Sequence, residues 1–378
     1  MRIVIAPDSF KESLSAENCC KAIQKGIKKI LPDAATLLIP MADGGEGTLS
    51  CLFNSVKGKI IRCKVHDPLS RQITASYGIM EKGKTALIEM AEASGLTLIP
   101  PKKRNPMITT SFGTGELIRD ALEKGCEKII LTLGGVATND AGIGMAQALG
   151  FKFLDKKGKE IPKGAYGLKF LDRIDTALVH PKLKNTEFFL CCDVKNPLCG
   201  KNGSAQIYGP QKGASPKMVK EIDKNLFHLS KIIKKDLGLS ILKKAGTGAA
   251  GGAGGGAIAF FNGKVQSGIK TVIELTNLEE KIKGADMVIT GEGKIDQQTL
   301  FGKTVAGVAS LAKKQHVPVI AFCGQISGEI KKLHDLGITA IFSIVPGPIK
   351  EEESLKKTSL YLQRKTEEVM RVLKIFIK

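Results

Sequence analysis

The pattern of apolar and polar residues at the start of the chain predicts a strand, a helix and a second strand. Residues 2–6 and residues 35–40 are apolar runs of strand length. Between them, from about Ser15, apolar residues recur at the three- and four-residue steps of one helix face. These positions are Ala16, Cys19, Cys20, Ile23, Ile27, Ile30 and Leu31. A helix between two such strands forms a βαβ unit, which predicts a parallel sheet.

The pattern changes in the middle of the chain. Short strand-like runs at residues 60–66, 73–80 and 85–90 are separated only by turn signals. Such close spacing predicts antiparallel pairing. Longer alternations of helix and strand follow, so this part of the chain is expected to form a mixed α/β domain.

The alternation typical of a parallel sheet returns near the end of the chain. Strand-like runs at residues 286–290, 317–323 and 338–345 are interspersed with helical patterns, and a long helical pattern at residues 355–374 follows them. Because both ends of the chain share this alternation, we predict an α/β protein with a flavodoxin- or Rossmann-like parallel-sheet domain built from both ends. A second, mixed α/β domain is inserted into it. The expected boundaries are residues 1–58 plus 270–378 for the first domain and residues 59–269 for the inserted one.

The chain is strongly basic, since 57 Lys and Arg against 37 Asp and Glu give a formal net charge of +20. Such a charge is typical of proteins that bind nucleic acids. However, only 8 of the basic residues are Arg, the lysines are spread in ones and twos, and there is no Trp to stack on bases. We therefore expect no nucleic-acid partner, and we attribute the charge to a solvated lysine-rich surface that attracts small anions.

The apolar runs also bear on location. They are of strand length, as at residues 129–133, so we expect no membrane partner. The N-terminal run turns polar at Asp8, which is too early for a signal peptide, so we expect a cytoplasmic protein. The nine cysteines show no CxxC spacing and the five histidines are scattered, which favours reduced thiols over a zinc site.

Acidic and glycine-rich turns follow three predicted strands of the first domain. They are Asp8-Ser9-Phe10-Lys11, Asp43-Gly44-Gly45-Glu46-Gly47 and Thr290-Gly291-Glu292-Gly293-Lys294. Ligands of an open parallel sheet bind beyond the carboxyl ends of its strands. Glycine lets backbone amides approach an anion, and carboxylates hold Mg²⁺ beside phosphate oxygens. These turns point to a nucleotide- or phosphate-handling enzyme; the alternative is that they are only tight strand-to-helix turns.

Known phosphate-binding motifs match only in part. Gly302-Lys303-Thr304 resembles the end of a P-loop, but Gln297 stands where that motif needs glycine. Gly246, Gly248 and Gly251 fit GxGxxG without a clear apolar strand before them. The glycine-rich run 246–256 is therefore either a closely packed nucleotide loop or a flexible linker. Asp193, which ends an apolar strand, is either a catalytic carboxylate or a turn former.

Seven segments, spread in order over nearly the whole chain, form a specific set. They are Ala6–Ala16, Pro40–Thr48, Thr109–Glu116, Gly134–Asp140, Cys192–Leu198, Tyr208–Gly213 and Gly291–Thr299. Together they resemble the type I glycerate kinases, with Val136, Ala141 and Tyr208 departing from the usual residues. The resemblance implies ATP- and Mg²⁺-dependent phosphorylation of D-glycerate, usually to 2-phosphoglycerate, with 3-phosphoglycerate as the alternative product. It also implies two α/β domains with the active site in the cleft between them.

The acidic and glycine-rich turns suit this chemistry. The expected catalytic residues are Asp193, Asp296 and Lys11, and the expected glycerate-binding residues are Asp8, Ser9, Lys11 and Asp43. The expected nucleotide-binding residues are Gly246, Gly248, Gly251, Gly291, Glu292 and Gly293, and the expected Mg²⁺ ligands are Asp43, Glu46 and Glu292. The alternatives are a kinase for another small hydroxy acid and a non-enzymatic anion or nucleic-acid binder. The sequence does not choose the base between Asp193 and Asp296, and it leaves the oligomeric state open.

Overall fold

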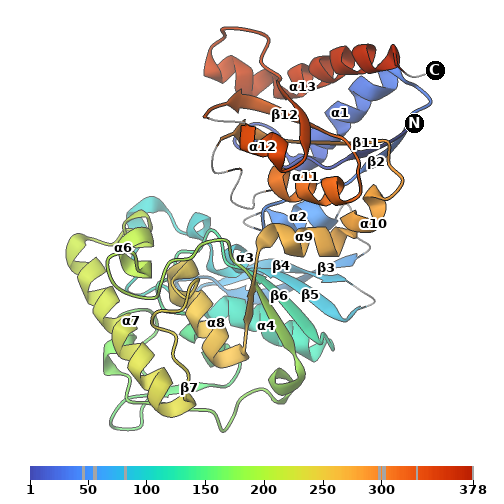
Figure 1. Ribbon diagram of the computed structural model, residues 1–378. Coiled ribbons are helices and arrows are strands. Elements are labelled where there is room, and N and C mark those ends of the chain that lie inside the picture. The colour runs from blue at the N-terminus through green and yellow to red at the C-terminus, as the bar shows by residue number, and fades with distance from the viewer. Residues whose placement is uncertain are drawn as a thin grey trace. The chain divides into compact units, whose positions relative to one another are not determined.

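The computed structural model describes residues 1–44, 47–53, 58–80, 83–296, 299, 304–328 and 331–376. The chain divides into two compact units (Figure 1). Unit 1 comprises Met1–Val56 with Ser267–Lys378, and unit 2 comprises Lys57–Gln266. Unit 1 contains a parallel sheet and unit 2 a mixed sheet, so the predicted α/β fold class is confirmed. No helix in the described ranges has both the length and the apolar character that crossing a bilayer requires.

The sheet of unit 1 has five strands in the order β13-β12-β11-β1-β2, and every neighbouring pair is parallel. The first residues of β11 and β12, like residues 3–5 of β1, are apolar and buried, which suits a sheet covered on both faces. Ile3 and Ile5 of β1 point to one face and Val4 points to the other. The strands are β1 (Arg2–Ile5), β2 (Ala35–Leu38), β11 (Met287–Ile295), β12 (Val319–Ile326) and β13 (Ile338–Ser343).

Two long helices, α1 and α13, pack against each other and on one face of this sheet. Ile23 and Ile27 of α1 share a core with Leu362 and Met370 of α13 and with the inward side chains of the strands. Ser15 caps α1 by accepting a hydrogen bond from the backbone of Asn18. The helices are α1 (Ala16–Ile30), α2 (Thr48–Phe53), α9 (Gly268–Thr276), α10 (Leu278–Ile282), α11 (Thr304–Lys314), α12 (Lys331–Asp335) and α13 (Glu351–Lys374).

The sheet of unit 2 has six strands in the order β10-β9-β6-β5-β4-β3. β10, β9, β6 and β5 pair in parallel, whereas β4 pairs antiparallel with both β5 and β3. The antiparallel pairing predicted for the closely spaced runs is therefore present. The strands are β3 (Gly58–His66), β4 (Gln72–Met80), β5 (Thr85–Glu89), β6 (Lys128–Thr132), β9 (Glu187–Cys191) and β10 (Lys264–Gln266), and β7 (Lys152–Leu154) pairs separately with β8 (Arg173–Asp175).

The helices of unit 2 contribute to one extended apolar core, in which Leu117, Leu226 and Ile258 are buried. The α-helices are α3 (Met90–Ser94), α4 (Phe112–Glu123), α5 (Ile143–Ala148), α6 (Ser204–Tyr208), α7 (Pro216–Leu237) and α8 (Ala253–Phe261). The 3-10 helices are η2 (Leu96–Leu98), η3 (Pro101–Lys103), η4 (Gly167–Phe170), η5 (Pro181–Asn185), η6 (Pro210–Lys212) and η7 (Ala249–Gly252).

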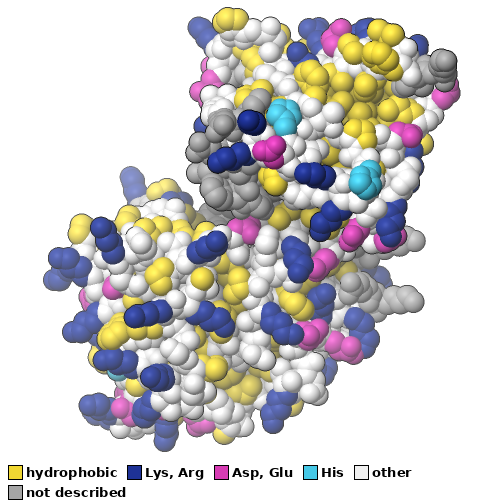
Figure 2. All heavy atoms as spheres, viewed as in Figure 1, with side chains coloured by type: hydrophobic (Ala, Val, Ile, Leu, Met, Phe, Trp, Pro, Cys, Tyr) yellow, Lys and Arg dark blue, Asp and Glu magenta, His cyan; other side chains and the backbone are white. Residues whose placement is uncertain are grey.

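The surface carries its basic residues singly. Figure 2 shows Lys and Arg side chains spread over the face in view rather than gathered into one stripe. All nine cysteines are free thiols. Burial raises the pKa of Cys19 and Cys323 to about 12, so these thiols stay protonated and pack as small apolar side chains.

Candidate active site

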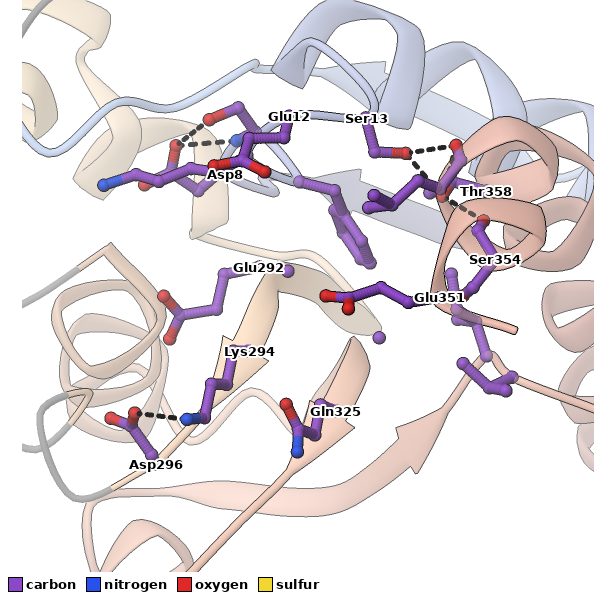
Figure 3. Close-up of a pocket in the computed structure, with 18 of the residues that line it drawn as sticks. Asp8, Glu12, Ser13, Glu292, Lys294, Asp296, Gln325, Glu351, Ser354 and Thr358 are labelled. Carbon is purple, nitrogen blue, oxygen red and sulfur yellow. Dashed lines mark hydrogen bonds and ion pairs between the residues drawn. The ribbon is translucent and has the colours of Figure 1, made fainter. Parts of the chain in front are cut away.

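A pocket of about 710 Å³ lies at the carboxyl edge of the unit 1 sheet (Figure 3). The chain runs outward from β1 to β2 on one side and from β11 through β12 to β13 on the other. The ends of β1 and β11 are thus the topological switch point, where open α/β sheets bind ligands. Seven of the residues predicted from the sequence line this pocket, namely Asp8, Ser9, Lys11, Asp43, Glu292, Gly293 and Asp296.

Asp8 follows β1 and is held by three hydrogen bonds. Its Oδ1 accepts from the backbone nitrogen of Ser9 at 2.6 Å and from Ser9 Oγ at 3.2 Å, and its Oδ2 accepts from Thr304 Oγ1. Burial raises the pKa of Asp8 above its usual value, the Thr304 hydrogen bond opposes this, and the nearby Asp43 carboxylate adds to it. A cation in the pocket would therefore stabilise the ionised form of Asp8.

Two lysines bring positive charge to the carboxylates of the pocket. Lys11 Nζ lies 3.7 Å from Asp43 Oδ2, and Lys294 Nζ lies 3.7 Å from Asp296 Oδ2. The side chain of Lys11 is 77% exposed, so its ion pair contributes little to stability. Lys11 is thus able to leave Asp43 for an anionic ligand at little cost.

Glu292 reaches the pocket from the last part of β11, flanked by two glycines. The turn predicted at residues 290–294 is wrong, because β11 stays paired with β12 and runs to Ile295. Glu292 is 9% exposed, and Thr299 Oγ1 donates to its Oε1 at 2.7 Å. A side chain at Gly291 would lie 2.4 Å from the carbonyl oxygen of Phe322, so close strand pairing explains that glycine. Gly293 borders the pocket, and a side chain built there would make only ordinary contacts with the backbone of Phe10 and Lys11. Close packing therefore does not explain this second glycine.

The structure describes two of the three residues predicted to bind Mg²⁺. Asp43 and Glu292 line the pocket, whereas Glu46 lies outside the described residues. Within the ranges described, no three His, Cys, Asp or Glu side chains are grouped to hold a metal ion. Mg²⁺ needs only one or two protein carboxylates when phosphates and water complete its coordination. The Asp43 carboxylate is among the causes that raise the pKa of Asp8, after burial, and a cation near the two carboxylates would oppose that shift.

The other predicted site residues belong to unit 2. Asp193 is exposed and comes two residues after the end of β9. The glycine-rich run adjoins it, because a side chain built at Gly246 would lie 3.5 Å from the carbonyl oxygen of Val194. Asp193 and Gly246 therefore sit together at the carboxyl end of β9, while their roles stay predictions.

The glycine-rich run is closely packed, which excludes the linker interpretation. It forms η7 and the start of α8, and both are largely buried. The amide of Gly248 donates to the carbonyl oxygen of Asn196 at 3.0 Å, and a side chain there would lie 2.1 Å from the Pro197 oxygen. Gly251 has φ +73°, and a side chain built there would lie 1.8 Å from the carbonyl oxygen of Thr138. Packing alone therefore requires glycine at these positions.

Gly251→Ala is expected to lower the free energy of unfolding by about 1–3 kcal/mol more than Gly158→Ala does. Gly158 is a matched control, because its φ is +75° and a Cβ there would contact nothing within 4 Å. Both variants incur the left-handed backbone penalty, and only Gly251→Ala adds the collision with Thr138. Urea unfolding of the two variants measures the difference, and equal losses would show that the glycine-rich run adapts to a side chain.

A buried polar cluster lies behind the glycine-rich run. Lys212, which is 2% exposed, donates to the carbonyl oxygen of Thr138 at 2.7 Å. Burial lowers the pKa of Lys212 to about 7, although nearby Asp140 opposes the shift. Asp140 is fully buried and accepts from the backbone nitrogen and Oγ of Ser111 at 2.7 and 2.9 Å. Among the described residues, the buried Thr138 Oγ1 and Asn139 Oδ1 have no hydrogen-bond partner.

Sequence reasoning missed several residues of the unit 1 pocket. Gln325 comes from β12 and Glu351 from the first turn of α13, and neither belongs to an acidic or glycine-rich turn. Ser13 Oγ donates to the carbonyl oxygen of Leu355 at 2.7 Å and also bonds Thr358, which ties the loop after β1 to α13. The pocket is therefore larger than the turns alone would predict.

Comparisons with known proteins match nearly the whole chain to the same family. A family model described as "Glycerate kinase family" matches residues 3–374. A "Glycerate kinase" of Halalkalibacterium halodurans is 47% identical over 96% of this chain and 95% of that protein. The "Glycerate 2-kinase" of Escherichia coli K12 is 49% identical over 91% of each protein. A crystal structure assigned to glycerate kinase 2 of Salmonella typhimurium LT2 matches with a TM-score of 0.90 and 43% identity, covering 99% of this chain and 98% of that one.

Proposed function

Because the chain belongs to the glycerate kinase family and is a kinase, we propose that it transfers the γ-phosphoryl group of ATP to D-glycerate with Mg²⁺ and releases 2-phosphoglycerate. The observation that carries this proposal is the unit 1 pocket, which gathers carboxylates and lysines at the switch point of a parallel sheet. The choice of the 2-hydroxyl is supported by the relative named "Glycerate 2-kinase". A non-enzymatic binding protein is excluded by the family.

The size of the pocket favours a nucleotide in unit 1. Glycerate has about seven heavy atoms, and at a water's share of about 30 Å³ each it fills about 210 Å³. The pocket offers about 710 Å³, which lies in the range of sites for larger ligands. Glycerate therefore leaves most of the pocket volume free for a second, larger reactant. A nucleoside triphosphate is a reactant of suitable size.

The reaction requires positioning and neutralisation of charge more than covalent chemistry from the protein. A hydroxyl oxygen of glycerate attacks the γ-phosphorus, and the bond to the bridging oxygen breaks, so that ADP leaves with the electron pair. The hydroxyl proton passes to a carboxylate within about 2.6–3.2 Å. We assign this role to Asp296, which lies in the pocket and is oriented by Lys294, and we keep Asp193 as the second candidate.

Mg²⁺ would supply positive charge that offsets the charge developing on the transferred phosphoryl group. We propose that Asp43 and Glu292 hold it, because both are carboxylates that line the pocket. The charge of Asp43 helps to raise the pKa of Asp8, and a divalent cation held near these carboxylates would reduce their repulsion. ATP and Mg²⁺ are both cytoplasmic reactants, so we place the reaction in the cytoplasm.

Lys11→Ala is expected to raise the KM for glycerate or to lower kcat by more than tenfold. The exposed ammonium of Lys11 is the cation that we propose meets the substrate carboxylate beside Ser9. Lys21→Ala is the control, because Lys21 is an exposed lysine paired with Glu17 on α1, away from the pocket residues. Steady-state kinetics in which Lys11→Ala and Lys21→Ala both match the wild type would remove Lys11 from the site.

The proposed substrate is tested by an ADP-release assay with a panel of small hydroxy acids. We expect D-glycerate to give the highest kcat/KM, with L-glycerate and D-lactate at least tenfold lower. D-lactate lacks the second hydroxyl, so its comparison isolates the contribution of that group. A higher kcat/KM for another hydroxy acid would favour the alternative of a kinase for that acid.

A further inference from the structure

The unit 1 pocket has two chemically different ends. One end lies beyond β1 and β11 and carries Asp8, Lys11 and Lys294. The other end lies beyond β12 and β13, where apolar side chains and the start of α13 replace the charged turns. The apolar lining residues of that end are Ile344, Val345, Ile349 and Leu355.

The separation of these two ends matches an elongated ligand. β13, β12, β11 and β1 are consecutive neighbours in the sheet. Three strand spacings of about 4.8 Å each place the two ends about 14 Å apart along the sheet edge. A compact three-carbon acid does not span that distance, whereas an extended nucleotide, with its base at one end and its phosphates at the other, does.

The charges fix the direction in which such a ligand lies. Lys294, at the β11 end of the pocket, attracts phosphates. At the other end, α13 opens with Glu351, Glu352 and Glu353, which offset the positive end of the helix dipole. Polyphosphate is therefore disfavoured beside α13, and a neutral, flat and largely apolar group is favoured there.

One carboxylate of α13 faces the pocket rather than a lysine of its own helix. Glu352 pairs with Lys356, and Glu353 pairs with Lys357 at 2.9 Å, whereas Glu351 lines the pocket. No ion pair or hydrogen bond joins the Glu351 side chain to any described residue, and its carboxylate points into the open space of Figure 3. A carboxylate accepts hydrogen bonds only, so Glu351 selects a ligand group that donates them.

We infer that the α13 end of the pocket is an adenine subsite, in which the base packs against Val345, Ile349 and Leu355 and its exocyclic amine donates to Glu351. This inference rests on the proposed function, since it takes ATP as the phosphoryl donor. With the 6-position of the base against Glu351, adenine presents a donor to the carboxylate, whereas guanine in the same orientation presents an acceptor. Glu351 thus makes the enzyme prefer ATP to GTP.

The experiment compares ATP with GTP in the wild type, Glu351→Gln and Glu352→Gln. The amide of Gln offers both a donor and an acceptor, so Glu351→Gln is expected to lower the ATP-to-GTP ratio of kcat/KM by at least tenfold. Glu352→Gln removes the same charge from the same helix turn without facing the pocket, and its ratio is expected to equal that of the wild type. The KM for glycerate is expected to be unchanged in both variants.

A second variant tests the apolar wall independently of the hydrogen bond. Ile349→Asp places a charge against the base, and it is expected to weaken ADP binding at least tenfold in calorimetry while the glycerate KM is unchanged. Thermal unfolding near that of the wild type shows that this variant is folded. An ATP-to-GTP ratio within twofold of the wild type in Glu351→Gln, or unchanged ADP affinity in folded Ile349→Asp, would overturn the adenine subsite. A wild type that phosphorylates glycerate with neither nucleotide would instead overturn the proposed function.

Discussion

Asp296→Asn is expected to lower kcat by at least about 100-fold, because general-base catalysis contributes about 10²–10⁴. The amide keeps the size of the carboxylate but cannot take the hydroxyl proton of glycerate. Asp296 is the proposed base because it lines the pocket and lies 3.7 Å from Lys294 Nζ, which orients it. The KM for ATP is expected to change little, and the ADP-release assay measures both constants.

Two further variants make this result decisive. Asp33→Asn replaces an exposed aspartate outside the pocket, and it is expected to behave as the wild type. Asp193→Asn tests the second candidate at the end of β9. Wild-type turnover in Asp296→Asn, together with a 100-fold loss in Asp193→Asn, would transfer the role of base to Asp193.

The second large effect concerns stability at Lys212. Its pKa is lowered to about 7 in the folded chain by burial, whereas an unfolded lysine keeps the usual value of 10.5. Between these values the unfolded chain binds the proton and the folded chain does not, so this lysine destabilises the fold at neutral pH. Its contribution to the free energy of unfolding therefore rises with pH, by about 3–4 kcal/mol between pH 7 and pH 10.

Lys212→Met removes this titration and keeps most of the side chain's volume. We expect the stability of Lys212→Met, relative to the wild type, to fall by about 3–4 kcal/mol between pH 7 and pH 10. The lost hydrogen bond to the Thr138 oxygen weakens the variant by the same amount at both pH values, so it cancels. Lys217→Met, at an exposed position of α7, is the control and is expected to show no such change. A Lys212→Met difference that does not vary with pH would contradict the lowered pKa.

The sequence predicted the parts of the fold that depend on local periodicity. The three-and-four spacing from Ser15 corresponds to α1, and the apolar run 2–6 corresponds to β1. The start of α13 was set too late, at residue 355 instead of Glu351, because its first turn is acidic and exposed and so lacks the apolar stripe. Strand order is set by contacts far apart in the chain, so it had no local signal.

The residues of the candidate site also fall into those that the sequence predicted and those that it did not. Asp8, Asp43 and Glu292 were predictable because each lies near or beyond the carboxyl end of a strand of one parallel sheet, and such strand ends meet at one edge. Glu351 was not predictable, since a glutamate in the first turn of a helix is usually a solvated residue that favours the helix dipole. The burial of Lys212 was not predictable either, because its place in the Tyr208–Gly213 segment of a lysine-rich chain does not show whether the side chain is exposed.

The most direct test of the central claim is phosphorus NMR of the enzyme with D-glycerate, ATP and Mg²⁺. We expect the γ-phosphate signal of ATP to decay while a single phosphomonoester signal grows, split by one proton because the phosphate is on C2. A signal split by the two protons of C3 would contradict the proposed product, and decay of ATP to free phosphate without any phosphomonoester would contradict phosphoryl transfer to glycerate itself.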